Sequence, residues 1–320
     1  MKRCILVSVL CFLFVLALPA VTDVRRRSPA AREAEVLPEP TPGASVRVLT
    51  QGGTVEMPLE EYLEGVLAGE MPAEFRIEAL KAQAVAARTY TLYMAANPKP
   101  AHPEADVCTE SGCCQAWLSR EELEARWGED FHKYDEKIRQ AVRETAGVYL
   151  TYGGEPILAC FHASSPGRTE SSGALWGRAL PYLVSVETPE TARDVPNFVT
   201  LREVSDAELR GAVSTAAPMA DFSGPPEDWV GERVLDVSGR VAAIRIGGTP
   251  IPGDRIRELF SLRSCCFTLE WTGERFLFTV EGGGHGAGLS QYGANVLAGE
   301  GLPWQEILFH YYPGAQLASL

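Results

Sequence analysis

The sequence predicts an α+β fold in which helices and antiparallel hairpins form one large domain. Apolar residues recur at helical spacing in several stretches, and strand-like stretches flank glycine-containing turns in others. These elements alternate without a regular strand–helix–strand period, which argues against a doubly wound parallel sheet. An arrangement in two lobes around a groove is compatible with the same pattern.

The first part of the body predicts a hairpin followed by helices. Residues 46–57 form two short strands around Gln51-Gly52-Gly53. Pro58 then opens a helix at its first turn, and that helix ends near Gly69. The further helices expected here are residues 78–96, which are rich in alanine, and residues 120–145, which Gly147 stops.

The second part of the body predicts more hairpins than helices. Residues 148–152 and 155–161 flank Gly153-Gly154, and the capping box Ser205-Asp206-Ala207-Glu208 opens a helix that runs to about Val213. The remaining expectations are a loop over 218–228, two strands within 233–246, a short helix over 253–262, a hairpin of 266–271 with 275–280, and helices near 289–298 and 303–311.

The N-terminus predicts export. Lys2-Arg3 precedes an apolar run over residues 4–18, so residues 1–22 form either a signal peptide or a single-pass membrane anchor. Residues 23–45 are rich in Pro, Arg, Glu and Ala without apolar periodicity, and we expect a disordered linker there. Residues 46–320 then make up the domain. The chain carries a net charge of −13, which argues against nucleic acid as a partner.

A glycine-rich run near the C-terminus, residues 285–294, has the composition of a site wall. Glycine permits positive φ and close backbone approach to a ligand, and the run carries polar and aromatic groups at His285, Ser290, Gln291 and Tyr292. A flexible turn between a strand and a helix is the alternative.

Glu70 is the candidate acid. It follows an amphipathic helix, precedes Pro72 and has apolar neighbours, so burial would raise its pKa towards neutral pH. A solvated Glu at a helix end is the alternative. Arg88 would hold a carboxylate or sugar hydroxyl, or else form an internal ion pair that locks its helix. Ser164 offers a hydroxyl for a polar ligand or for turn formation; no Gly-x-Ser-x-Gly motif supports a serine hydrolase.

Four residues of metal-ligating type fall within thirteen positions between two predicted helices: His102, Cys108, Cys113 and Cys114. Tetrahedral zinc takes Cys and His in fours. A disulfide, for example between Cys108 and Cys113 or Cys114, is the alternative in an exported protein. His132 is a further candidate ligand.

Taken together, several segments resemble the stage II sporulation protein D family, which also includes amidase-enhancer-like proteins. The matching segments are residues 58–72, 78–90, 176–177 with 180–183, 285–294 and 307–314, so the resemblance runs from about residue 46 to 314.

The resemblance implies lytic cleavage of peptidoglycan glycan strands during engulfment of the forespore. It makes Glu70, in the Gly-Glu-Met-Pro motif, the catalytic acid of a lytic transglycosylase. It implies zinc on the His and Cys cluster, although the family's pattern has a His where Cys113 stands. The groove-lining candidates are Arg88, Ser164, His285, Ser290, Gln291 and Tyr292.

Two other functions compete with this one. The amidase-enhancer relatives imply that this protein is a non-catalytic partner of an N-acetylmuramoyl-L-alanine amidase. Its expected partners are then that amidase and other engulfment proteins. A disulfide-stabilised wall-binding module is the third hypothesis.

Overall fold

The predicted hairpin opens the part of the chain that the structure describes. The computed structural model describes residues 43–320, so the predictions for residues 1–22 and for most of the linker lie outside it. Strand β1 (Ser45–Thr50) pairs antiparallel with β2 (Gly53–Pro58). The turn between them uses Gly53 at φ +113°, which few L side chains adopt. The domain boundary near residue 45 stays a prediction.

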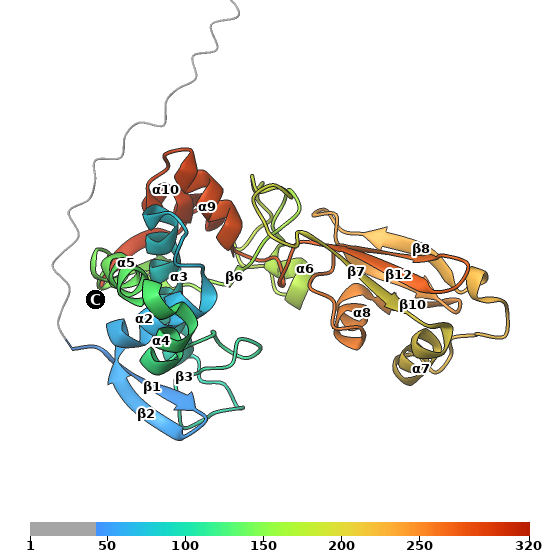
Figure 1. Ribbon diagram of the computed structural model, residues 1–320, viewed down its shortest axis with the longest axis horizontal. Helices are drawn as coiled ribbons and strands as arrows, with labels where there is room; N and C mark the ends of the chain where they lie inside the picture. The colour runs from blue at the N-terminus through green and yellow to red at the C-terminus, as the bar shows by residue number, and fades with distance from the viewer. Residues whose placement is uncertain (1–42) are drawn as a thin grey trace, which may run out of the picture. The chain divides into compact units, whose positions relative to one another are not determined.

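Most of the helices lie close to their expected positions, and α6 (Ser172–Trp176) is one that the sequence did not predict. The helices are α2 (Leu59–Glu70), α3 (Ile77–Ala96), α4 (Arg120–Trp127), α5 (Phe131–Arg143), α6, α7 (Asp206–Ala216), α8 (Gly253–Leu259), α9 (Gln291–Gly299) and α10 (Trp304–Tyr311), with 3-10 turns η2 (Gly128–Asp130) and η3 (Pro226–Asp228). Helix α3 packs against α2, α5, α9 and α10 (Figure 1). Its small side chains permit these close contacts, and most of its residues are buried.

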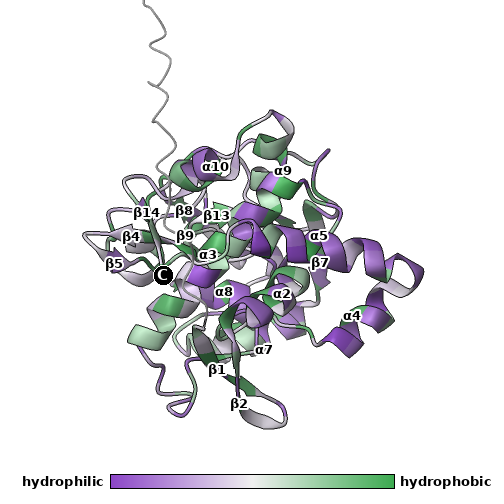
Figure 2. Cartoon of the chain, turned by 90° about the vertical axis from the view of Figure 1, so that its left-hand side faces the viewer, coloured by the Kyte–Doolittle hydropathy of each residue, from purple (hydrophilic) through white to green (hydrophobic). Residues whose placement is uncertain are grey.

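The prediction of one helix over residues 120–145 is wrong. Helix α4 ends at Gly128, whose backbone (φ 50°, ψ −119°) is incompatible with an α-helix, and α5 begins at Phe131 after the turn η2. Figure 2 shows α4 as mostly hydrophilic, and Leu123 is its buried residue. The helical spacing of apolar residues continues across Gly128, so this spacing does not reveal the break between the two helices.

The strands form small, mostly antiparallel sheets. The remaining strands are β3 (Val107–Cys108), β4 (Val148–Tyr152), β5 (Glu155–Pro156), β6 (Phe161–His162), β7 (Val199–Val204), β8 (Val230–Leu235), β9 (Val241–Ile246), β10 (Thr249–Pro252), β11 (Phe267–Trp271), β12 (Phe276–Glu281), β13 (Leu289–Ser290) and β14 (Gln316–Ser319). The sheet orders are β2-β1-β3, β10-β9-β8, β11-β12-β7, β13-β6 and β14-β4-β5. The architecture is α+β, which confirms the predicted class.

The hairpin around Gly153-Gly154 is shorter than predicted. Strand β5 ends at Pro156, and the chain then leaves the sheet through tight turns in which Ala159 N–H donates to the Ile157 carbonyl. It re-enters a strand only at β6, which pairs in parallel with β13. This departure brings residues 161–165 beside the glycine-rich run.

Two apolar cores stabilise the described residues. One lies between the helices and includes Leu63, Val66 and Leu80. The other lies among β7–β12, α7 and α8, and it contains Phe276 and Phe278. We refer to residues 199–281 as the sheet region. Its strands β7 and β10 were not predicted, nor were α6 and β14.

Candidate functional site

Glu70 is the last residue of α2, at the point where the helix gives way to extended backbone. Met71 is extended (φ −123°, ψ 143°) and Pro72 follows it. Met71 and Phe75 are buried beside this turn. The Glu70 side chain is consequently half-buried among apolar groups rather than fully solvated.

Two donors from distant segments reach the Glu70 carboxyl. The Ala116 backbone N–H donates to Oε1 at 2.6 Å, and the Gln291 side-chain amide donates to Oε2 at 3.4 Å. Burial raises the pKa of Glu70 above its ordinary value, although both hydrogen bonds oppose the shift. Burial therefore outweighs the two donors, and the acid keeps its proton to higher pH than a solvated Glu.

Gln291 and Tyr292 begin α9, which places them beside the turn that carries Glu70. The Tyr292 ring packs edge-on against Phe75 with centroids 4.8 Å apart. Pairing of β13 with β6, and a hydrogen bond from Tyr292 N–H to the Ala163 carbonyl, fix this end of the helix. The glycine-rich run thus supplies two side chains beside Glu70.

Buried contacts hold the glycine-rich run, residues 285–294, which forms one wall of the site. They involve Gly288, Ser290 and Gly293. The Ser290 hydroxyl is fully buried; it caps α9 by accepting from Gly293 N–H and donates to the Glu190 carboxylate. Gly288 has φ +70°, and a Cβ there would lie 2.0 Å from the Cys160 carbonyl oxygen. A side chain at Gly288 would push the glycine-rich run away from the Cys160 backbone, so only glycine allows the two segments to lie this close.

His285 lies in the same glycine-rich run, six residues before Gln291, which contacts Glu70. Its Nδ1 accepts a hydrogen bond from Ala287 N–H at 3.0 Å, and its ring packs near those of His162 and Trp176. Burial, with the charges of two arginines, lowers the pKa of His285 to about 4. His285 is therefore a neutral imidazole at neutral pH.

Arg88 and Ser164, like Ser290, are predicted groove residues that lie in the interior instead. Arg88 is fully buried; its guanidinium pairs with Glu60 at 2.5 Å and donates to the Val148 carbonyl at 3.0 Å. This is the internal ion pair that was the alternative interpretation from sequence. Ser164 is also buried, and its backbone pairs with Gly283 rather than facing Glu70.

Sequence reasoning missed the groups that support the wall. His162 accepts from Ser165 Oγ at 2.6 Å and donates to the Ala287 carbonyl at 3.1 Å, while Arg240 donates to Ser165 Oγ at 2.9 Å. Glu190 accepts from both Ser165 N–H and Ser290 Oγ. The glycine run marks this region in the sequence, but nothing near Glu190 or Arg240 does.

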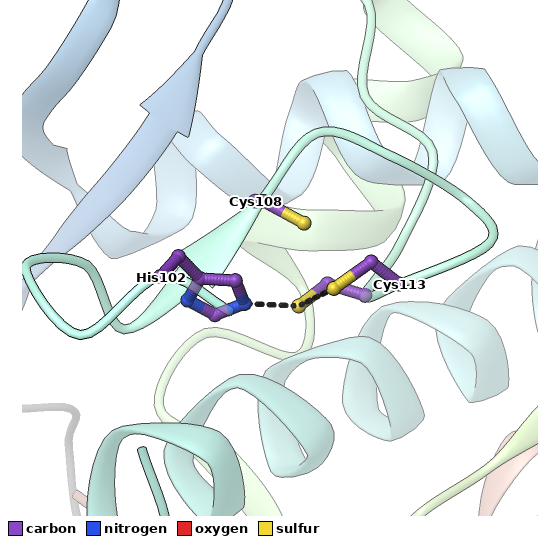
Figure 3. Close-up of side chains that lie close together, drawn as sticks. His102, Cys108 and Cys113 are labelled. Carbon is purple, nitrogen blue, oxygen red and sulfur yellow. Dashed lines mark hydrogen bonds between the residues drawn. The ribbon is translucent and has the colours of Figure 1, made fainter. Parts of the chain in front are cut away.

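The four predicted metal-ligand residues come together in the loop between α3 and α4 (Figure 3). The donor atoms of His102, Cys108, Cys113 and Cys114 all lie within 4.8 Å of one another. His102 Nδ1 donates to the Ala105 carbonyl at 3.2 Å, which leaves Nε2 facing the sulfur of Cys114 at 3.3 Å. His132 is exposed on α5 and takes no part.

The spacing of these atoms fits a tetrahedral ion. Bonds of about 2.3 Å to sulfur and about 2.0 Å to nitrogen place neighbouring ligand atoms roughly 3.5–3.8 Å apart. The separations here are 3.3 Å for Cys114 to His102 and 4.0 Å for Cys113 to Cys114. All six cysteines within residues 43–320 are free thiols, so the disulfide interpretation finds no support. The cluster could hold a metal.

Some surface hollows lie apart from Glu70. One of about 610 Å³ includes Arg168, Glu187 and His310, and one of about 400 Å³ lies beside α2 and α5.

Between residues 43 and 320, no helix is both long and apolar enough to cross a membrane.

Fold and site together define an α+β protein that presents one half-buried glutamic acid to a glycine-rich wall, next to a thiol–imidazole cluster. Residues 50–152 match the family model described as stage II sporulation protein. The chain is 38% identical over 273 residues to stage II sporulation protein D of Bacillus amyloliquefaciens, covering 84% of this chain and 77% of that one. For the Bacillus subtilis protein of the same name, the identity is 36% over 293 residues, covering 91% and 83%. The chain belongs to the stage II sporulation protein D family.

A more distant relative has a different name. The amidase enhancer of Bacillus subtilis is 26% identical over 307 residues, which cover 80% of this chain and 40% of that protein.

Proposed function

We propose that this protein is a lytic transglycosylase that cleaves peptide-stripped glycan strands of peptidoglycan during sporulation. The observation that carries the proposal is Glu70: a half-buried carboxyl with a raised pKa, faced by Gln291 and beside Tyr292. A raised pKa keeps a carboxyl protonated to higher pH than a solvated Glu, which favours its use as a general acid.

We propose different tasks for the two oxygens of Glu70, because their hydrogen bonds differ in length. Oε1 accepts the short bond from Ala116 N–H and Oε2 the longer one from Gln291, so we assign the acidic proton to Oε2, the less tightly held oxygen. Oε2 protonates the glycosidic oxygen as the bond from that oxygen to C1 of the muramic acid residue breaks. The same oxygen then takes the proton from the C6 hydroxyl as O6 bonds to C1.

This sequence closes an anhydro ring and returns the proton to Glu70 without consuming water. Glycosidases commonly use two carboxyl groups across the bond. Within residues 43–320, the groups that shift the pKa of Glu70 are Ala116 and Gln291, and no carboxylate is among them. A mechanism in which the substrate supplies its own nucleophile requires only one acid, and this agrees with the site.

Tyr292, Gln291 and the partly exposed His285 are the proposed contacts for the strand. Tyr292 offers an aromatic face, and His285 a neutral imidazole, neither of which requires a charged ligand. Glycan strands stripped of peptide carry only lactyl carboxylates, which an acidic protein tolerates.

The test is release of anhydro-muramic ends from peptide-stripped glycan strands. We expect Glu70→Gln to abolish release while Glu300→Gln, an exposed glutamate beyond α9, retains it. Equal release by wild type and Glu70→Gln would contradict the proposal.

We propose that zinc occupies the His and Cys cluster in a structural role. His102, Cys108, Cys113 and Cys114 would hold it, and the four donors leave no position open for a reacting group. The metal would stabilise the loop that carries Ala116 to Glu70.

The likeness to an amidase enhancer supports a second candidate function, that of a non-catalytic partner of an amidase. If Glu70→Gln stimulates amidase release of stem peptides as well as wild type does, this function stands without catalysis. In either role we propose an exported protein facing the cell wall, with residues 1–22 as signal or membrane anchor and with other engulfment proteins as neighbours.

A further inference from the structure

A second concave site lies beside α2, away from the Glu70 carboxyl. Its volume is about 400 Å³, within the range of small-molecule pockets. Glu61 and Glu64 come from α2, Trp117 from the loop after the metal cluster, Trp127 from α4 and Arg139 from α5. Four segments thus contribute aromatic and ionisable groups to one hollow.

This pocket is separate from the proposed active site. Glu61 and Glu70 are nine residues apart on one helix, or about two and a half turns, so their side chains leave opposite sides of α2. The loop nevertheless touches both sites: Ala116 N–H donates to Glu70, and Leu118 N–H donates to the Gly65 carbonyl at 3.2 Å.

Both indoles are held by packing. Trp127 packs against Tyr134, with centroids 5.7 Å apart and planes at 64°, and against Phe131 at 6.1 Å. Trp117 lies against Gly65 so closely that a Cβ there would be 2.3 Å from Nε1. Both indoles remain partly exposed, and they offer fixed aromatic surface at low entropic cost.

The charged groups of the pocket are mostly paired with one another. Arg139 lies between Glu64 at 3.3 Å and Asp135 at 3.1 Å, and Arg120 reaches Asp135 at 3.4 Å. Glu61 is exposed, and within residues 43–320 its carboxylate has no ion pair or hydrogen bond. Near-complete pairing favours a neutral ligand over a polyanion or a metal ion.

We propose that this pocket is an accessory saccharide-binding site for β-1,4-linked N-acetylated amino sugars. The inference rests on the proposed function, because it extends the grip on the same glycan strand beyond the Glu70 site. A pyranose ring has an apolar C–H face that packs on an indole, and its hydroxyls donate to carboxylates and accept from guanidinium groups. Trp127, Glu61 and Arg139 offer these three kinds of contact on neighbouring elements.

The experiment uses the full-length chain carrying Glu70→Gln, labelled with fluorotryptophan, and titrates it with a tetramer of N-acetylglucosamine. We expect the ¹⁹F resonances of Trp117 and Trp127, identified by substitution with Phe, to shift on titration. Adding Glu61→Gln should raise the dissociation constant reported by the Trp117 signal about three- to tenfold, the effect of replacing a charged hydrogen-bond acceptor by a neutral amide oxygen.

The matched control is Glu274→Gln, at an exposed hairpin turn, which should leave that dissociation constant unchanged. Unmoved Trp117 and Trp127 signals at saturating tetramer would overturn the proposal, as would a shift produced only by a lysine-containing peptide. Since Glu70→Gln removes turnover, the binding result is independent of whether Glu70 is the catalytic acid. Shifts in these signals with no loss of anhydro product in the earlier assay would retain this site and reject the mechanism.

Discussion

At the scale of single residues, the site depends on a contest between burial and hydrogen bonding at Glu70. Burial raises its pKa, while Ala116 N–H and Gln291 lower it. The side chain that donates is replaceable, whereas the backbone donor is not. This difference makes Gln291 the residue through which the acidity of Glu70 can be tuned.

Gln291→Leu should shift the pH dependence of glycan cleavage. Removing the donor raises the Glu70 pKa further, so the alkaline limb, where the acid loses its proton, should move to higher pH. The profile of kcat/KM against pH measures this. A limb that stays in place, or moves to lower pH, would show that Gln291 does not act on Glu70.

Arg88→Met should destabilise the fold. It leaves Glu60 without its partner and the Val148 carbonyl without its donor, a loss of about 3 kcal/mol. Urea unfolding of wild type and variant gives the difference. A variant of wild-type stability with weakened glycan binding would instead restore the substrate-contact interpretation of Arg88.

At the scale of elements, the loop between α3 and α4 connects the metal cluster to the acid. Cys114 belongs to the cluster, and Ala116, two residues on, donates to Glu70. Order in this loop therefore sets the position of a donor at the active site.

Cys108→Ser should lower zinc content and thermal stability together. We expect about one zinc per wild-type chain and a clear loss in the variant, because a structural site needs all four ligands. Elemental analysis of freshly purified protein measures the metal. Cys160→Ser, a buried cysteine outside the cluster, is the control; unchanged zinc in Cys108→Ser would remove Cys108 from the ligand set.

Gly128→Ala should destabilise the break between α4 and α5. Its φ of +50° strains any L side chain, at a cost of about 1–3 kcal/mol. Gly211→Ala is the matched control: Gly211 lies exposed inside α7 with open space around a Cβ, so the change should stabilise by about 0.5–1 kcal/mol. Chemical denaturation that gave both variants the same sign would contradict this account.

Local signals in the sequence predicted most helices because capping residues and apolar spacing act within a few residues. Ser205 and Pro58 mark helix starts in this way. Gly128 shows the limit, since apolar spacing continues across it. Glu70 and the four metal-ligand residues stand out by local context. The roles of Ala116, Glu190 and Arg240 arise from contacts over long sequence separations, which no local pattern encodes.

At the scale of the whole molecule, Arg240 links the sheet region to the support of the wall. It is 2% exposed and donates to Ser165 Oγ, to the Arg168 carbonyl and to Ser238. Ser238 also donates to Glu170 at 2.5 Å. These contacts join β8–β9 to the segment that holds His162 and α9.

Arg240→Met should weaken the cooperativity of unfolding. Without these hydrogen bonds, the sheet region and the helices would melt separately, each on its own apolar core. Tryptophan fluorescence and far-ultraviolet circular dichroism should then give different midpoints in the variant and a common midpoint in wild type. Coincident curves in the variant would show that the two cores are coupled through other contacts.

The donation from Ala116 to Glu70 has a consequence for how this site can change over generations. Since the amide belongs to the main chain, any residue except proline at position 116 preserves it. Most substitutions at position 116 would therefore leave this hydrogen bond to Glu70 in place, whereas any change that deforms the loop would break it. Chelators or thiol oxidants that disturb the metal cluster would then change the pKa of Glu70 indirectly, because Cys114 lies two residues before Ala116.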